Sequence, residues 1–354
     1  MRVLLLARYS WAGNSSRHRS LKYLPYLESQ GIQTTTAPLV GEDYIDALYS
    51  GRRRSAATLA GAYLTRALKL LSVRNYDLIW IERELFPMIP AIGESLLRVG
   101  GIRYVVDYDD AIFHNYDRHR SGVVRMLLGR KIDRVMRHAS LVVAGNRYLA
   151  ERALQAGAGR VEILPTAIDP EANPLQTTPA GGPFTIGWIG SPLNARYLKP
   201  LRPALEELTR EPDTRLVLIG ARDVDLPGVH FERLPWAEES EAADIGSFDI
   251  GIMPMPDAPF ERGKCGFKIL QYFAAGRPAV ASPVGVNSTI IRDGENGFLA
   301  RTPDEWIRAI TTLRRDPEGR RRMGLAGRTL VEHTYSTHTV GPRLAALLRD
   351  AASG

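Results

Sequence analysis

Short, continuous apolar runs recur along the 354-residue chain, each separated from the next by a segment with helical periodicity. Strands of a parallel sheet that is covered by helices on both faces are apolar throughout, whereas half-exposed strands alternate apolar and polar residues. The runs therefore predict parallel sheets in an α/β fold. The expected strands are residues 3–7, 32–37, 78–82, 104–107, 141–144 and 162–164, and then 184–189, 216–219, 229–231, 250–253 and 279–281.

A Pro- and Gly-rich segment without periodicity, residues 167–183, interrupts this rhythm and is typical of a linker. It predicts an N-terminal domain over 1–175 and a C-terminal domain over 176–339, with a last helix, about 340–354, packing back on the first. The chain is too long for one ordinary core and suits two domains. Because ligands bind outside the carboxyl ends of parallel strands, we expect a site in an interdomain cleft.

Composition excludes several classes of protein. The single cysteine, Cys265, excludes a disulfide framework and a cysteine-based zinc site. No signal peptide or window of about 20 uninterrupted apolar residues is present, so a cytoplasmic protein is expected. The net charge of +7 resides entirely in residues 1–175, which hold 24 Lys and Arg against 17 Asp and Glu. This asymmetry indicates an anionic partner of the first half or, equally, a general preference for arginine.

The most specific segment covers residues 249–299. A strand ends in a proline-bounded loop, and a Gly-Lys-Cys-Gly stretch, 263–266, then opens a helix that closes at Gly276. Small residues at a helix start expose unpaired backbone N–H groups, and the helix dipole adds positive potential. Lys264 and Lys268, one turn apart, place two ammonium groups at the same end. The pattern predicts a cradle for a diphosphate, against the alternative that both are solvated helix lysines.

This segment resembles the C-terminal domain of GT-B fold glycosyltransferases, specifically the large retaining family 4 (glycosyl transferases group 1). The Ala-Ala-Gly-Arg-Pro-Ala-Val-Ala turn at 274–281 and the Asn-Gly-Phe-Leu ending at 296–299 carry the resemblance. It implies two Rossmann-like parallel-sheet domains facing an interdomain cleft, a UDP- or GDP-sugar as donor substrate, and no cofactor or metal. The donor-binding residues that it implies are Gly190, Ser191, Arg196, Gly263, Lys264, Cys265, Gly266, Phe267, Lys268 and Gln271.

The sequence departs from the family pattern at its carboxylates. Gln271 stands where the family usually holds ribose hydroxyls with glutamate, and an amide still donates and accepts hydrogen bonds. Gly263 stands where a glutamate usually lies near the transferred sugar, with Glu261 as a substitute two positions away. The basic pair after the first strand of this domain is reduced to Arg196, so Lys264 and Lys268 are expected to supply the diphosphate charge and to act in catalysis.

Three acids, Asp107, Asp109 and Asp110, follow the strand at 104–107. Three carboxylates so close together repel one another unless cations or ligand hydroxyls offset the repulsion. The resemblance implies that Asp109 and Asp110 face the donor sugar or the acceptor hydroxyl as catalytic groups. Helix capping and a Mg²⁺ site are the alternatives, and His114 is a reserve candidate.

The loop after the first strand combines small polar residues with two arginines, which suits an anionic group at the mouth of a helix. The loop at 82–84 follows a second strand at the same expected edge. The residues that we assign to an acceptor or phosphate loop are Gly13, Asn14, Ser15, Ser16, Arg17, Arg19, Glu82 and Arg83. A helix cap with surface arginines is the alternative for the first of these loops.

Basic residues gather at Arg52–Arg54 and in Arg118–Arg137. The apolar and basic positions along 122–138 resemble a basic amphipathic helix on anionic lipid. A helix that packs on a sheet is the commoner explanation, and nucleic acid is not expected because no binding module accompanies the charge.

The sequence thus predicts a glycosyltransferase that moves a sugar from a nucleotide-diphosphate sugar to an acceptor hydroxyl, with retention, in bacterial polysaccharide or glycoconjugate synthesis. The expected acceptor is a glycan or a lipid-linked intermediate, met in the cytoplasm or at the inner face of the plasma membrane. The alternatives are a nucleotide-sugar epimerase or hydrolase on the same fold, or a non-catalytic nucleotide-sugar-binding homologue.

Overall fold

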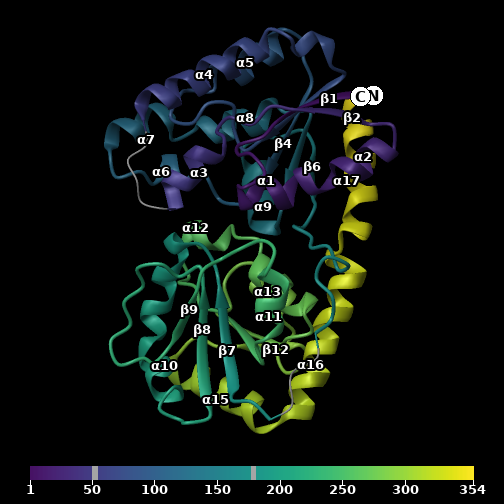
Figure 1. Ribbon diagram of the computed structural model, residues 1–354. Helices are drawn as coiled ribbons and strands as arrows, with labels where there is room; N and C mark the ends of the chain where they lie inside the picture. Colours follow the sequence, from purple (N-terminus) through teal and green to yellow (C-terminus); the bar gives the residue numbers. More distant parts are fainter. Residues whose placement is uncertain (50–54, 177–180) are drawn as a thin grey trace. The chain divides into compact units, whose positions relative to one another are not determined.

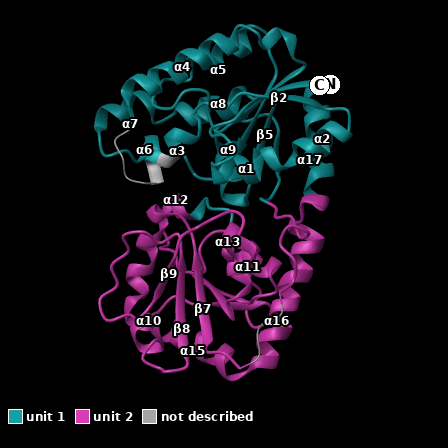
Figure 2. Cartoon of the chain, viewed as in Figure 1, with its two compact units in different colours: residues 1–166, 262–265, 340–354 teal, residues 167–261, 266–339 magenta. Residues whose placement is uncertain are grey.

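The computed structural model describes residues 1–49, 55–176 and 181–354 (Figure 1). The basic cluster Arg52–Arg54 lies outside the described residues, as does the middle of the expected linker. The chain divides into two compact units (Figure 2). Unit 1 comprises residues 1–166, 262–265 and 340–354, and unit 2 comprises residues 167–261 and 266–339.

Unit 1 is built on a six-stranded parallel sheet in the order β2-β1-β3-β4-β5-β6. Its strands are β1 (Arg2–Leu6), β2 (Gln33–Thr36), β3 (Leu78–Glu82), β4 (Tyr104–Tyr108), β5 (Leu141–Ala144) and β6 (Val161–Ile163). The four central strands are almost wholly buried, which is why they are apolar throughout. Strand order reverses between β1 and β3, so the loops that follow these two strands meet at a topological switch point, where ligands bind in open α/β sheets.

The helices of unit 1 alternate with these strands. They are α1 (Asn14–Arg19), α2 (Leu24–Ser29), α3 (Glu42–Tyr49), α4 (Ala56–Leu70), α5 (Ile92–Val99), α6 (His114–Asp117), α7 (Gly122–Leu128), α8 (Lys131–His138) and α9 (Arg147–Gln155). Side chains of α5, α8 and α9 pack with β1, β3, β4 and β5 in one apolar core. Asn146 caps the start of α9 by accepting from Leu149 N, and Ser55 caps α4 by accepting from Thr58 N.

Unit 2 holds a second six-stranded parallel sheet, in the order β12-β11-β10-β7-β8-β9. Its strands are β7 (Phe184–Ile189), β8 (Thr214–Ile219), β9 (Glu232–Leu234), β10 (Ile250–Met253), β11 (Ala279–Ala281) and β12 (Gly297–Leu299). Apolar cores lie on both faces, one with α10 (Arg202–Leu208) and α15 (Pro303–Arg315), the other with α11 (Glu241–Gly246) and α13 (Phe267–Ala274). The order reverses between β7 and β10, which makes their carboxyl ends the switch point.

The remaining helices complete unit 2 and return to unit 1. They are α12 (Pro259–Arg262), α14 (Asn287–Ile290), α16 (Pro317–Leu330) and α17 (Thr337–Ser353). In the residues of α17 that belong to unit 1, Arg343 donates to Ile163 O at 3.0 Å and Arg349 donates to Gln30 O at 2.7 Å. A Cβ on Gly341 would lie 3.2 Å from the Tyr26 ring, so this glycine lets the helix approach closely.

The structure corrects three details of the expected elements. The strand expected at 229–231 forms instead at β9, and β12 was not expected. The single basic helix expected over 122–138 is two helices, α7 and α8, divided at Gly129 and Arg130. Glycine is a poor helix former in a helix interior, and the break gives α7 and α8 different surroundings.

Candidate functional site

The switch point of unit 1 gathers the acids of β4 and the arginine that follows β3. Glu82 of β3 is in register with Asp107 of β4, so Arg83 emerges beside Asp109 and Asp110. Its guanidinium donates to Asp109 Oδ1 at 2.9 Å and to Asp110 Oδ2 at 3.4 Å, while its backbone N–H donates to Asp107 O at 2.9 Å. The arginine thus offsets the repulsion within the acidic cluster.

Arg83 has a left-handed backbone with φ of 64°. This conformation costs a residue with a side chain roughly 1–2 kcal/mol, and such strain persists where the surrounding contacts determine it. Here the strained backbone directs the guanidinium to two carboxylates at the sheet edge. The geometry marks Arg83 as a positioning group for Asp109 and Asp110.

The segment 262–265 belongs to unit 1 and brings Lys264 to the same acids. Asn146 Nδ2 donates to Gly263 O at 2.8 Å and to Lys264 O at 3.1 Å, and Lys264 Nζ lies 3.6 Å from Asp110 Oδ1. A Cβ on Gly263 would lie 2.5 Å from Ala111 Cβ, so only glycine allows this approach. Lys264 therefore belongs to the acidic cluster of unit 1, although it precedes Lys268 by only four residues in sequence.

Charge and burial shift the pKa values of two groups in this cluster, Asp110 and Cys265. Burial raises the pKa of Asp110 above its ordinary value, Asp109 raises it further, and the Lys264 and Arg83 cations oppose the rise. Burial also raises the pKa of the Cys265 thiol to about 12. Its Sγ lies 3.2 Å from Asp109 O. A thiol with this pKa stays protonated at neutral pH and is a poor nucleophile. We therefore assign Cys265 a structural role, in which its contact with Asp109 O helps to fix the segment 262–265.

The loop after β1 and the residue Glu82 form a buried network. Glu82 accepts from the hydroxyls of Ser16 and Ser20 and from Arg8 N. Arg19 forms a buried bidentate pair with Asp107, at 2.9 and 3.0 Å, and donates to Leu164 O. These contacts fix the mouth of α1, and a ligand role for Glu82, Ser16 or Arg19 stays a prediction.

The other predicted loop residues differ in position. A Cβ on Gly13 would clash with Tyr9 at 2.1 Å, which makes the tight turn glycine-dependent. Asn14 is exposed and its Oδ1 accepts from Arg17 Nη2 at 3.2 Å, whereas Ser15 is half-buried. The side chain of Arg17 is buried, and no pattern in the sequence indicated that it points inward.

A cavity of about 530 Å³ opens beside this edge, and the sequence did not show that the residues lining it lie together. Cationic and titratable side chains from loops after β1, β3 and β4 surround it, with Met88 at one side. They are Arg8, Glu84, His114, Arg118, His119 and Arg120. Glu84 is held by the Lys131 ammonium and by Tyr116 Oη, so Arg8, Arg118 and Arg120 give the cavity a cationic character.

The switch point of unit 2 places Lys268 beside Gly190. Gly190 directly follows β7, and Lys268 lies in the first turn of α13, which follows β10. The Lys268 ammonium lies 4.3 Å from the centroid of the Trp188 ring, a cation–π contact. A Cβ on residue 190 would lie 2.6 Å from Lys268 Nζ, so glycine here leaves room for the lysine side chain.

The start of α13 also depends on glycine. Gly266 has φ of 68°, and a Cβ there would lie 2.5 Å from Ile290 Cδ1. No side chain caps this helix start. Its first N–H groups, together with the Lys268 ammonium, provide the donors and positive potential that a diphosphate requires. Phe267, the first residue of α13, packs in part against the core.

Gln271 has a carboxylate partner that the sequence did not reveal. Its Nε2 donates to Glu241 Oε1 at 2.8 Å, and Trp236 Nε1 donates to Glu241 Oε2 at 2.5 Å. Gln271 is buried, on the face of α13 that meets α11. A carboxylate thus lies beside Gln271, on Glu241, at the first residue of α11. The acidic run at 238–241 was the signal that could have identified it.

Glu261 and Arg196 lie together in unit 2. Glu261 is buried and accepts from Tyr197 Oη at 2.7 Å, and Arg196 Nη2 lies 3.9 Å from its Oε1. Ser191 immediately precedes the 3₁₀ segment Pro192–Leu201 that carries Arg196 and Tyr197. The substitute role of Glu261 near the transferred sugar stays a prediction.

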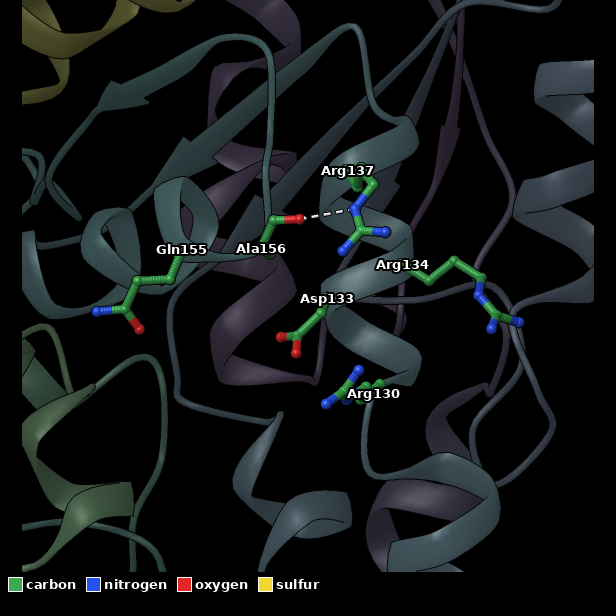
Figure 3. A pocket seen from close by; sticks show the side chains of 6 residues that line it. All are labelled: Arg130, Asp133, Arg134, Arg137, Gln155 and Ala156. Atoms are coloured by element: carbon green, nitrogen blue, oxygen red, sulfur yellow. Dashed lines mark hydrogen bonds between the residues drawn. The ribbon is translucent and has the colours of Figure 1, made fainter.

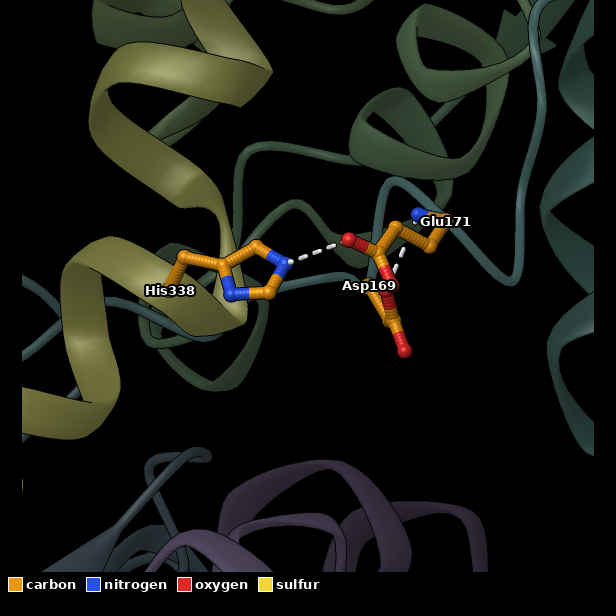
Figure 4. Close-up of side chains that lie close together, drawn as sticks. All are labelled: Asp169, Glu171 and His338. Carbon is orange, nitrogen blue, oxygen red and sulfur yellow. Dashed lines mark hydrogen bonds and ion pairs between the residues drawn. The ribbon is translucent and has the colours of Figure 1, made fainter.

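Figure 4 shows a different cluster, in which Asp169, Glu171 and His338 of unit 2 bring ligand atoms within 4.8 Å of one another. His338 Nε2 lies 3.5 Å from Glu171 Oε1, and Asp169 Oδ1 accepts from Glu171 N at 2.9 Å. Glu171 and His338 are exposed, and the Asp169 oxygen is already used in a local turn. Exposed groups of this kind are common without an ion, so the cluster does not identify a metal site.

Within residues 1–49, 55–176 and 181–354, no helix combines the length and the apolar character that crossing a bilayer requires.

Parts of the chain are similar in sequence to known glycosyltransferases. The profile of the family "Glycosyl transferases group 1" matches residues 183–316. The putative glycosyltransferase EpsD of Bacillus subtilis is 42% identical over 77 residues, which is 21% of this chain and 20% of EpsD. Sucrose synthase of Thermosynechococcus vestitus is 34% identical over 113 residues, 30% of this chain and 13% of that protein. The matched stretches thus span a fifth or less of these relatives.

Solved structures match over the full chain. HepE of Anabaena, in complex with UDP and glucose, has a TM-score of 0.72 at 16% identity, covering 99% of this chain and 100% of HepE. Sucrose-phosphate synthase from Thermosynechococcus elongatus has a TM-score of 0.71 at 15% identity, covering 99% and 98% of the two chains. At these identities the likeness shows the fold. The chain therefore has the two-sheet GT-B fold, and residues 183–316 of its second unit match the family of glycosyl transferases group 1.

Proposed function

We propose that the protein is a glycosyltransferase that transfers a sugar from a UDP-sugar to an acceptor hydroxyl. The observation that carries the proposal is the arrangement at the switch point of unit 2, where Lys268 lies beside Gly190 at the start of α13. This arrangement lies within the matched family domain. HepE, which has the same fold, is described in complex with UDP and with UDP-glucose, and this favours UDP over GDP.

Lys268 and the first N–H groups of α13 would stabilise the charge that develops on the leaving diphosphate. Preorganised charges and donors directed at developing charge supply much of the rate enhancement in such reactions. Gln271, held by Glu241, would bind ribose hydroxyls with an amide and a carboxylate instead of a carboxylate alone. Retention at the anomeric carbon is what the family resemblance implies, and we keep it as part of the proposal.

The two lysines would have separate tasks. Sequence reasoning assigned both to the diphosphate, but in the structure Lys264 pairs with Asp110 in unit 1. Contact of Lys264 with a diphosphate would have to compete with that ion pair. We therefore assign diphosphate binding to Lys268 and the positioning of Asp110 to Lys264, with Arg83 supporting Asp109 and Asp110 from the other side. Asp109 and Asp110 would face the reacting sugar or the acceptor hydroxyl.

The cationic cavity of unit 1 supports an acceptor that carries phosphate. Arg8, Arg118 and Arg120 line it, and guanidinium groups bind phosphate oxygens with paired hydrogen bonds. The excess positive charge of residues 1–175 agrees with such an acceptor. A lipid-linked glycan intermediate in bacterial surface polysaccharide or glycoconjugate synthesis fits this chemistry.

The proposal is tested first by binding and then by turnover. Nucleoside diphosphates and their sugars would be screened by thermal unfolding, and we expect UDP and a UDP-sugar to stabilise the protein. K268M should abolish the shift, whereas K199M, at an exposed lysine of the same unit, should retain it. Equal shifts for K268M and the wild type would contradict the assignment of the diphosphate site.

Turnover distinguishes transfer from the alternatives. The UDP-sugar that binds would be incubated with a sugar linked to lipid through a diphosphate, and with the same sugar as a simple alkyl glycoside. We expect UDP release that depends on the diphosphate-linked acceptor. Rapid turnover without acceptor would indicate a hydrolase or epimerase, and UDP-sugar binding that is never followed by turnover would indicate a non-catalytic binding protein.

A further inference from the structure

Two neighbouring helices of unit 1 expose apolar side chains in regular rows. On α4 the row is Leu64, Leu68 and the capping residue Leu71, and on α5 it is Ile92, Leu96 and Val99. Spacings of three and four residues place each set on one helix face. These side chains are between 58 and 86% exposed. Such contiguous apolar exposure marks an interaction surface, whereas scattered single apolar residues do not.

The two rows belong to one face because Phe86 links the helices. The Phe86 ring packs against Tyr63 of α4 with centroids 5.6 Å apart, and it lies 3.4 Å from the Cβ position of Gly93 on α5. Figure 1 shows α4 and α5 adjacent along this part of unit 1. Neither helix is covered on its outer side by any described part of unit 1, as the exposure of both rows shows.

Helix α7 extends the apolar surface. Val123, Met126 and Leu127 are 61 to 77% exposed. The segment that precedes α7 adjoins the segment that precedes α5, because Arg118 and Met88 line the same cavity. Met88 is itself more than half exposed. The cationic cavity that we assign to the acceptor thus has the exposed apolar side chain of Met88, which lies between β3 and α5, in its wall.

The charges on this face have one sign. All residues of α4, α5 and α7 are described, and their sole carboxylate is Glu94, which is buried and accepts from Leu85 N. Helix α8 packs against α5, and its residues Arg134 and Arg137, with Arg130 immediately before the helix, line a cavity of about 420 Å³ (Figure 3). Asp133 in that cavity is paired with Arg152 at 2.7 and 3.0 Å, so its charge is compensated.

His138, the last residue of α8, is affected by the same positive charges. Burial lowers the pKa of His138, and Arg98 of α5 together with Arg134 and Arg137 of α8 lowers it further. The cations of α5 and α8 therefore act on one place. An apolar surface bordered by arginines and lacking exposed carboxylates is complementary to the acyl boundary and phosphate groups of an anionic bilayer.

We propose that the face formed by α4, α5 and α7 docks on an anionic lipid bilayer, with lipid phosphate groups held in the arginine cavity of α8. The inference deepens the proposed function and rests on it for its purpose, since it would present the acceptor cavity to lipid-linked substrates. A second copy of this chain is a poorer occupant, because a symmetric contact would bring like-charged arginines together.

The first test measures partition onto vesicles. Purified protein would be floated with vesicles of phosphatidylcholine alone and with one third phosphatidylglycerol. We expect strong binding only to the anionic vesicles, weakening as salt is raised. L68S combined with L96S should lower the partition constant at least tenfold, since burial of one leucine is worth about tenfold. L325S, on exposed Leu325 of α16, is the matched control and should bind like the wild type.

The second test addresses the arginine cavity. R130Q combined with R134Q should lower binding to anionic vesicles about tenfold or more, because each basic residue near the surface contributes roughly fivefold. R308Q combined with R321Q, on α15 and α16, is the charge-matched control. Calorimetric titration with glycerol phosphate separates a lipid source from a free one: tight binding of the soluble phosphate without vesicle binding would overturn the proposal.

Further outcomes would also overturn it. Equal binding to neutral and anionic vesicles, or no effect of either double variant, would remove the role of this face. Conversion of a dimer to a monomer by L68S and L96S would identify the face as a contact between copies. Vesicle binding is measured without any turnover of substrate, so it does not depend on catalysis. Circular dichroism checks that each variant is folded, and the UDP-induced thermal shift checks that it still binds the donor. Vesicle binding without sugar transfer would leave the docking surface intact and reject the proposed function.

Discussion

Lys264 and Lys268 lie one helical turn apart in sequence, yet the structure places them in different units and in different electrostatic surroundings. Lys264 lies 3.6 Å from Asp110 in a cluster with Arg83 and Asp109, whereas Lys268 lies over the Trp188 ring beside Gly190. Two identical side chains in one motif therefore have different expected tasks. Lys268 of unit 2 is expected to bind the diphosphate of the substrate, whereas Lys264 of unit 1 is expected to position the Asp110 carboxylate.

The largest effect is expected at Lys268. Replacement by methionine keeps the length of the side chain and removes its charge, so kcat/KM for a UDP-sugar should fall roughly 10²–10³-fold, as when a single preorganised transition-state contact is lost. Steady-state kinetics would measure the fall, with K199M as the control. A loss below about threefold would mean that Lys268 does not contact the diphosphate. The assignment of diphosphate binding to Lys268 in unit 2 would then be wrong.

Asp110→Asn tests the other side of the comparison. Removal of the carboxylate charge should lower kcat about 10–100-fold, while the affinity for UDP should stay within about threefold, because Asp110 belongs to unit 1. Turnover and UDP calorimetry on one protein preparation would measure both quantities. A parallel loss of UDP affinity would show that the acidic cluster and the diphosphate site act as one.

Arg83→Gln sharpens the account of the acidic cluster through pH. Arg83 lowers the pKa of Asp110 and burial raises it, so removal of the guanidinium should raise the pKa further. Fewer Asp110 side chains would then be ionised at a given pH. If the ionised form is active, the acid limb of the kcat profile moves to higher pH, with roughly tenfold lower activity at its foot. An unshifted pH profile of kcat would mean that Arg83 does not influence the ionisation that limits turnover.

The smallest effect is expected at Glu241. Its carboxylate holds Gln271 and accepts from Trp236, so Glu241→Gln should raise KM for the UDP-sugar about 3–10-fold and change kcat little. The double variant with Gln271→Ala should be less than additive, because the two side chains share a hydrogen bond. If the effects of the two substitutions on KM were additive, Glu241 and Gln271 would act independently on separate parts of the UDP-sugar.

Much of the fold could be predicted because its signals are local. Continuous apolar runs located the central strands of both sheets. The family resemblance assigned Gly190 and Lys268 to one donor site, and the structure places them beside each other. The division of the Gly-Lys-Cys-Gly stretch between units could not be predicted, since it depends on Asn146 and Ala111, more than a hundred residues away in sequence.

Other features of the site also depend on contacts that sequence patterns do not record. Glu241 supplies a carboxylate beside Gln271 from a different helix, and no spacing rule connects them. The cationic cavity combines loops after three strands, so its residues are scattered between Arg8 and Arg120. The apolar rows of α4 and α5 look like core positions in sequence, because periodicity identifies a face without showing what covers it.

One measurement compares the two lysines directly: calorimetric titration of UDP into K264M and K268M. The account predicts that K268M weakens UDP binding at least thirtyfold, since loss of a charge-assisted contact to phosphate is worth about 2 kcal/mol or more. It predicts that K264M binds UDP within about threefold of the wild type while its turnover falls. A loss of UDP affinity in K264M equal to or larger than that in K268M would contradict the division of tasks between the two units.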